Sequence, residues 1–306
     1  MAFTVKDVAE LRKQTGCGMM DCKRALEAAN GDMQEALKVL REKGMAATAK
    51  KQSRIAAEGI VDILTVGNTT AMIEVNSETD FVAKNDTFRA FVRSLLETVI
   101  ATRPATVEEL MTKTMADGQT VEAAMQEKTF TIGEKLSLRR FVTVDGVVST
   151  YVHGGGATGV VVLFAAEDAA VANPGFAEFA KNIALQAAAL PSQYVDRDAV
   201  PASVIEEERS ILEKQMQQDP KFAGKPANVL AGIINGKLGK FYENNCLVDQ
   251  LYVKDDSMTV GKYIAAAAKE FGGAIKVLAV YRYDKGEGIE KREENFADEI
   301  AKMVNN

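Results

Sequence analysis

The side chains best suited to act on a partner molecule are neighbours near the middle of the chain, at Asp80 and Phe81. Thr79 before them is a typical helix N-cap, and Asp80 stands four residues before Lys84, a spacing that supports an ion pair on a helix. Asn85 then predicts a break before a second helix. A carboxylate beside a ring on such a short, stiff tip would suit insertion into a partner, the ring filling a pocket and the charge disturbing a metal or phosphate site.

A second interpretation of Phe81 is purely structural. Phe88 follows seven residues later, so the two rings would share one face of a helix and fill the core. The pattern alone leaves both interpretations open.

The single histidine, His153, ends a predicted strand beside a glycine-rich turn. Acid-base and triad catalysis need a nucleophile or a carboxylate near the histidine, and the sequence places neither beside this one. We expect a strand-end side chain with a satisfied hydrogen bond, and a partner contact from this corner is the alternative. Residues 154–159 match the spacing GxGxxG, but a strand follows them instead of a phosphate-binding helix, so dinucleotide binding is not expected.

No cofactor and no metal are predicted. Cys17, Cys22 and Cys246 form neither a CxxC pair nor an even set, which fits a reducing compartment and makes a zinc site improbable. Residues 232–237 are one residue short of a P-loop and lack its Ser or Thr.

Composition indicates an ordinary globular protein with room for two or three domains, since the chain has 306 residues and is 47% hydrophobic. A net charge of -6 with interspersed signs gives no large basic field, which argues against direct nucleic-acid binding. The N-terminus has no apolar signal region, and the longest apolar run, residues 160–166, is far too short for a membrane span. We therefore expect a cytoplasmic protein without a membrane partner.

The periodicity predicts an α+β fold. Residues 4–43 are predicted to form three short helices closed by Gly44, and residues 45–54 a basic linker or a frayed helical connection. Asp145-Gly146 predicts a β-hairpin between strands 138–144 and 147–153. Helices at 202–218 and 226–242 predict a helical hairpin whose apolar stripe closes internally or pairs with another chain. The other predicted elements are strands 59–66, 70–76, 160–166 and 274–283 and helices 86–102, 176–190 and 259–271.

Four separated segments carry a resemblance to a known family. They are residues 11–23 (LRKQTGCGMMDCK), 79–85 (TDFVAKN), 241–250 (FYE and CLVDQ) and 286–290 (GEGIE). In this order they resemble bacterial elongation factor Ts over essentially the whole chain.

The resemblance implies a domain order. A small three-helix, ubiquitin-associated-like module and its linker would occupy residues 1–54, followed by two α+β core subdomains, an inserted antiparallel coiled-coil hairpin and a C-terminal helix. The corresponding ranges are 55–137 for the first subdomain, 138–190 with 243–284 for the second, 191–242 for the hairpin and 285–306 for the C-terminal helical module.

The resemblance also implies a function, guanine nucleotide exchange on elongation factor Tu without covalent chemistry. Residues 79–82, which are Thr79, Asp80, Phe81 and Val82, would insert into its GTPase domain and disturb the magnesium and phosphate environment of bound GDP. A further domain of elongation factor Tu would also be contacted, and the hairpin is a candidate homodimer contact. The other implied partner contacts are Leu11, Met19, Met20 and His153.

Two alternatives come from other classes. The N-terminal helices and basic linker could form a translation-associated RNA-binding or scaffolding module, which would show steep salt dependence of RNA affinity. An enzyme using His153 and the glycine corner would turn over a nucleotide by itself, but no nucleophile or complete phosphate motif accompanies that histidine.

Overall fold

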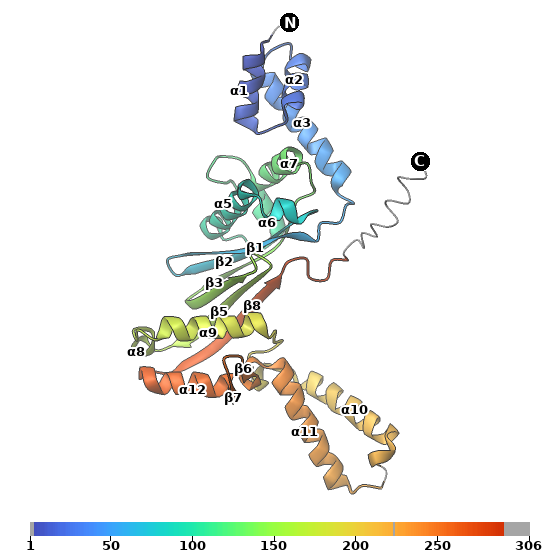
Figure 1. The fold of residues 1–306 in the computed structure, drawn as a ribbon, viewed down its shortest axis with the longest axis vertical. Coiled ribbons are helices and arrows are strands. Elements are labelled where there is room, and N and C mark those ends of the chain that lie inside the picture. Colours follow the sequence, from blue (N-terminus) through green and yellow to red (C-terminus); the bar gives the residue numbers. More distant parts are fainter. Residues whose placement is uncertain (1–2, 223, 291–306) are drawn as a thin grey trace.

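The computed structural model describes residues 3–222 and 224–290. It is 53% helical and 22% strand, with small sheets, so the α+β prediction is confirmed. Figure 1 shows a group of three helices at one end, two sheets with their helices in the middle and a pair of long helices at the other end.

The N-terminal helices are α1 (Val5–Thr15), α2 (Met19–Ala28) and α3 (Met33–Lys51). Thr4 and Asp7 form a capping box at the start of α1, and the Asp32 side chain caps α3. Their apolar faces meet in a small core that includes Leu11, Cys22 and Leu26. Local capping and periodicity were sufficient to predict these helices.

The predicted end of the third helix at Gly44 is wrong, because α3 continues to Lys51. Gly44 lies where α3 packs against α7 (Val121–Ile132), and a Cβ there would be 3.7 Å from the Cβ of Phe130. The Lys51 ammonium also donates a hydrogen bond to the Thr129 carbonyl at 3.2 Å. Tertiary packing thus carries the helix through a residue that ends many isolated helices.

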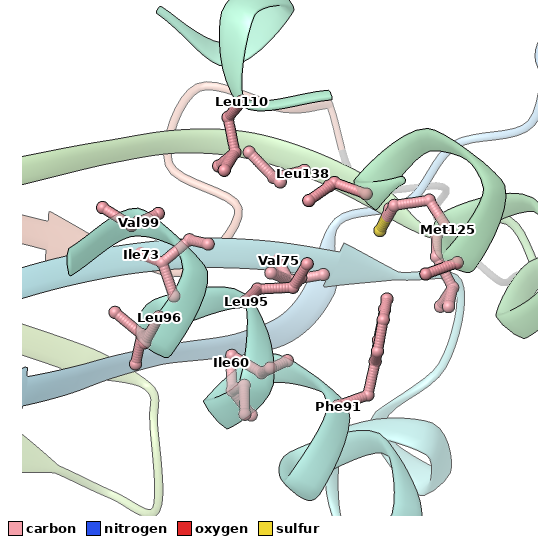
Figure 2. Close-up of a cluster of buried hydrophobic side chains, with 14 of the residues drawn as sticks. Ile60, Ile73, Val75, Phe91, Leu95, Leu96, Val99, Leu110, Met125 and Leu138 are labelled. Atoms are coloured by element: carbon pink, nitrogen blue, oxygen red, sulfur yellow. The ribbon is translucent and has the colours of Figure 1, made fainter. Parts of the chain in front are cut away.

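The first sheet has the antiparallel order β1 (Glu58–Val66), β2 (Thr69–Ser77) and β3 (Ser137–Asp145). One of its faces is covered by α5 (Asp86–Thr102), α6 (Val107–Thr112) and α7. Figure 2 shows the core between them, built from strand residues such as Ile73 and helix residues such as Leu95.

The second sheet has the antiparallel order β4 (Val147–His153), β5 (Thr158–Ala166) and β8 (Ile275–Asp284). Helices α9 (Phe176–Ala189) and α12 (Val260–Phe271) pack on it, and Phe164, Phe176 and Phe179 form an aromatic group in its core. The short elements α8 (Asp168–Val171), β6 (Leu251–Tyr252) and β7 (Asp255–Thr259) complete this half, and the sequence pattern had not predicted β6 and β7.

The predicted hairpin at Asp145-Gly146 is wrong. β3 pairs with β2, and β4 pairs with β5, so the chain passes from one sheet to the other at this dipeptide. Asp145 is held by Arg103 and Thr69, with oxygen-to-donor distances of 2.7 Å and 2.6 Å. Strand β3 therefore belongs to the first sheet. The predicted boundary between the two core subdomains, after residue 137, had assigned almost all of this strand to the second subdomain. The domain boundaries themselves remain predictions.

The two sheets face each other through a shared apolar layer. Val61 and Met72 come from the first sheet and Val161 from the second, and all three are completely buried. The turn before β5 also reaches the first sheet, since the Val61 amide donates to the Gly156 carbonyl at 2.8 Å. A Cβ on Gly156 would lie 2.8 Å from the Cβ of Ile60. The glycine-rich turn therefore allows this close approach between the sheets.

A buried carboxylate fastens the segment after β8 to β2. Glu74 is fully buried and accepts hydrogen bonds from Arg140 at 2.6 Å, Arg139 at 3.0 Å, the Gly286 amide at 2.8 Å and Asn76 at 3.1 Å. Burial alone would raise the pKa of Glu74, but these hydrogen bonds outweigh it and leave the pKa below its ordinary value. The last described residues are thus anchored beside the strand that leads to the candidate site.

The helical hairpin consists of α10 (Ala202–Gln218) and α11 (Ala227–Asn245), which project away from the sheets in Figure 1. Leu212 and Met216 of α10 pack against Ile234 and Leu238 of α11 in a small core of their own. Much of the apolar stripe is therefore closed within the hairpin, as one of the two sequence interpretations expected.

Two further points concern the ends and the surface of the chain. The predicted C-terminal helix falls largely on residues 291–306, which lie outside the described residues. Within residues 3–222 and 224–290, no helix combines the length and the apolarity needed to cross a bilayer.

Candidate functional site

The candidate site is the tip that follows β2. All nine residues of β2 are buried, and the strand ends at Ser77. The chain then forms the four-residue helix α4 (Asp80–Ala83) and turns into α5, whose first amides are capped by the Asn85 side chain at 2.8 Å from Thr87 N. Thr79 stands at the predicted N-cap position, although its side chain makes no capping hydrogen bond, and the predicted break at Asn85 is found.

Phe81 stands on the outside of this tip with 80% of its surface exposed. Ala83 is buried, and Val82 packs partly against the core beneath α5. The interpretation of Phe81 as a core residue is therefore wrong, because the break at Asn85 separates it from the helix that carries Phe88. A protruding ring of this kind is available to fill a pocket in another molecule.

Asp80 is paired within the tip. Its carboxylate accepts a hydrogen bond from the Lys84 ammonium at 2.6 Å, as the spacing of four residues predicted. This hydrogen bond holds the pKa of Asp80 below its ordinary value, so the side chain is ionised at neutral pH. The charge lies directly beside the exposed ring and stays accessible.

Thr79 precedes the tip without capping it through its own side chain. Instead, its hydroxyl donates to Glu134 Oε1 at 2.6 Å, and its amide donates to Glu134 Oε2 at 2.9 Å. The Thr79 carbonyl accepts from the Ser77 hydroxyl at 2.9 Å. The residue in front of Asp80 is thus held from both sides by groups outside α4.

The neighbouring Glu78 joins the tip to the end of the N-terminal helices. Its carboxylate accepts from the Lys135 amide at 2.5 Å and from Arg54 at 3.3 Å. The Lys135 ammonium in turn donates to the carbonyl groups of Gln52 and Arg54 at 2.7 Å and 2.8 Å. The segment after α7, the segment after α3 and the start of the tip therefore form one hydrogen-bonded junction.

His153 lies at an exposed corner where β4 ends, and its Nδ1 is 3.0 Å from the Tyr151 hydroxyl. The corner is tied to the first sheet's helices, because Arg89 of α5 donates to the Gly155 carbonyl at 2.7 Å. Arg89 is one helical turn after Asn85. The structure thus connects the corner of His153 to the start of α5, close in sequence to the tip.

The N-terminal candidates divide into two groups. Met19 and Met20 are both exposed, at 44% and 58%, at the start of α2. Leu11 is completely buried in the core of the three helices, so in this structure it supports their surface from beneath instead of lining it. In Figure 1 these helices stand apart from the two sheets.

The chemistry of the tip favours binding over bond making. A projecting aromatic ring and an ionised carboxylate lie side by side on a short helix, and the polar groups of Thr79 are engaged in positioning. Within the described part of the chain, no cluster of three or more His, Cys, Asp or Glu residues is arranged to hold a metal ion. The arrangement is suited to entering a partner and displacing groups there.

Sequence reasoning missed Glu134 and Arg89. Each lies more than 50 residues from the group that it holds, so no local spacing connects them. One signal was present for Glu134, since it directly follows Gly133, whose positive φ of 85° ends α7. A charged residue immediately after a helix end is fixed in position and can serve a distant segment.

A comparison with family models was made for the whole chain. The model described as Elongation factor TS matches residues 78–287. The match covers more than half of the chain, includes both sheets apart from β1 and β2, and begins one residue before Thr79.

Proposed function

The chain belongs to the elongation factor Ts family, and we propose that it releases GDP from elongation factor Tu by inserting the tip formed by residues 79–82. At the family level it is a translation elongation factor for nucleotide exchange on elongation factor Tu. The finer proposal is that Phe81 enters the GTPase domain while Asp80 disturbs the magnesium and phosphate site, after which GTP rebinds. The observation that supports this proposal most directly is that Phe81 is exposed, while adjacent residues of the tip are held by hydrogen bonds or by burial.

Thermodynamic linkage explains how one protein can release a nucleotide that is bound to another. If this chain binds nucleotide-free elongation factor Tu more tightly than the GDP complex, then it must weaken GDP binding by the same factor. Only contacts that differ between the two states contribute to this coupling. The tip supplies such a contact if the GTPase domain can bury the Phe81 ring completely only after the GDP site has been distorted.

The free energy of burying one ring limits how much Phe81 alone can accelerate GDP release. Burying a large apolar side chain contributes roughly 1.5 to 3 kcal/mol, which corresponds to about a tenfold to hundredfold change in an equilibrium. Phe81 is almost completely exposed in the free protein, so most of this free energy is available on binding. A larger acceleration of GDP release requires further contacts.

Those further contacts are assigned to other exposed residues. Met19 and Met20 would dock on the GTPase surface, and flexible thioethers suit such a contact. His153 would approach the phosphate-binding region from its corner. Contacts with a second domain of elongation factor Tu, a coiled-coil role of the hairpin, its pairing in a homodimer and a cytoplasmic location remain predictions.

Stopped-flow release of a fluorescent GDP analogue from elongation factor Tu tests the proposal. At fixed magnesium concentration, release should accelerate with increasing concentration of this protein and reach a plateau. Well-folded protein that leaves the release rate unchanged at every concentration would overturn the exchange function for this chain.

A further inference from the structure

The geometry points to Glu134 as a positioning residue that holds the tip ready for insertion. This inference rests on the proposed function, since the value of a fixed tip depends on what the tip enters. It concerns a residue that is hydrogen-bonded to Thr79, the residue that precedes Asp80.

Helix α4 has little means of holding its own shape. It has four residues, and helices this short are unstable without outside contacts. An N-cap threonine usually stabilises such a turn through its side-chain oxygen, but the Thr79 hydroxyl makes no hydrogen bond to α4. Burial contributes through Ala83, which offers little apolar surface, and through Val82, which is only partly buried.

Glu134 supplies the missing restraint. Both of its carboxylate oxygens bind Thr79, one at the hydroxyl and one at the amide. Hydrogen bonds to a charged acceptor are stronger than neutral ones, and two of them on one residue fix its orientation as well as its position. The direction in which α4 leaves the sheet, and hence where Phe81 points, follows from that orientation.

The position of Glu134 is itself determined by packed elements. It lies between Gly133, which ends α7, and Lys135, which binds the carbonyl groups of Gln52 and Arg54. Helix α7 packs against α3, the helix that carries the N-terminal module. Glu134 therefore sets the tip relative to the helices that bear Met19 and Met20.

A fixed tip matters most in the step that displaces GDP. A mobile tip would have to be ordered at the moment of insertion, and that cost would lower the limiting rate of GDP release. Initial docking through the exposed methionines does not require an ordered tip. Loss of Glu134 should therefore lower the limiting rate and leave the half-saturating concentration almost unchanged.

The first test measures the tip in the free protein. The chain has no tryptophan, so Phe81→Trp introduces a unique tryptophan at an exposed position, whose fluorescence can be excited selectively. In that background Glu134→Gln removes the charge and replaces one of the two acceptor oxygens that bind Thr79 by an NH2 donor, and Thr79→Val removes the hydroxyl donor. Both should lower the fluorescence anisotropy by similar amounts. Anisotropy equal to that of the parent in both variants would overturn the positioning role.

The second test measures GDP release with the native Phe81. Glu134→Gln and Thr79→Val should each lower the limiting rate roughly tenfold to hundredfold, as expected for one hydrogen bond to a charged group. Thr79→Ser keeps the hydroxyl donor and should release GDP faster than Thr79→Val. The double variant should be no slower than the slower single variant, because both changes remove one interaction.

The control is Glu97→Gln, which makes the same charge change at an exposed position of α5. Limiting rates of Glu134→Gln and Glu97→Gln that agree within twofold would overturn the inference. The anisotropy test needs no elongation factor Tu, so it decides the restraint even if the wild-type protein fails to release GDP. That failure would count against the proposed function alone.

Discussion

Phe81 and Ala83 are two residues apart on α4, yet the phenylalanine is 80% exposed and the alanine only 4%. Hydrophobic burial alone would place them the other way round, since the larger ring gains more from leaving water. The free protein therefore forgoes that stabilisation at Phe81. Large apolar side chains held in this way are typical of contacts that are completed by a partner.

Gly156 should be the most sensitive position of the glycine-rich turn. Its φ is +106°, and a Cβ there would lie 2.8 Å from the Cβ of Ile60 in β1. We expect Gly156→Ala to lower the free energy of urea unfolding by about 2 to 4 kcal/mol, from backbone strain and overpacking together.

The matched control is Gly155→Ala. Gly155 also has a positive φ, but a Cβ there meets only the end of the flexible Arg89 side chain at 3.4 Å. Gly155→Ala should lower the free energy of unfolding by a smaller amount, about 1 to 2 kcal/mol. Equal losses in the two variants would contradict the close packing between the sheets.

The pair formed by Asp145 and Arg103 should be visible in the pH dependence of stability. The hydrogen bonds from Arg103 and from Thr69 lower the pKa of Asp145 from 3.8 to about 2. A carboxylate with a depressed pKa in the folded state stabilises the protein above its unfolded pKa, and this contribution disappears as the pH falls from about 4 towards 2.

Unfolding measured between pH 2 and pH 6 checks this point. In Asp145→Asn the stability should fall less steeply below pH 4 than in the wild type. The control Asp256→Asn changes an exposed carboxyl of β7 and should keep the wild-type slope. A wild-type slope in Asp145→Asn would show that the pair is not maintained in solution.

Met20 offers a test of docking separate from the test of insertion. Met20 and Met45 have the same exposure of 58%, on α2 and α3 respectively. We expect Met20→Ser to raise the half-saturating concentration for GDP release several-fold, because part of the free energy of burying its side chain is lost. The limiting rate should stay unchanged. Met45→Ser should alter neither quantity, and identical behaviour of the two variants would remove Met20 from the interface.

Local signals in the sequence predicted much of the fold. The start of α5 at Asp86 follows from the Asn85 cap and the apolar stripe, and the ion pair of Asp80 with Lys84 follows from their spacing. The turn signal at Asp145-Gly146 misled because turn chemistry acts locally, whereas β3 pairs along its length with β2, which is distant in sequence.

The site was predictable in part. The tip residues could be picked out by type and spacing, but the exposure of Phe81 could not, because a period of seven suits a core helix and an exposed tip equally. The contacts of Glu134 with Thr79 join segments 55 residues apart and have no periodic signature. Long-range polar contacts of this kind require the structure.

The most direct test of the account compares Phe81→Ala with wild type in GDP release from elongation factor Tu. The exposed ring contributes little to the folded state, so the free energy of unfolding should change by no more than about 0.5 kcal/mol. The limiting rate of GDP release should fall roughly tenfold to hundredfold, because the ring's burial is lost at the step that displaces the nucleotide. The control Val66→Ala alters an exposed apolar residue at the opposite end of the β1–β2 hairpin and should release GDP normally. A folded Phe81→Ala protein that releases GDP at the wild-type limiting rate would contradict the insertion mechanism.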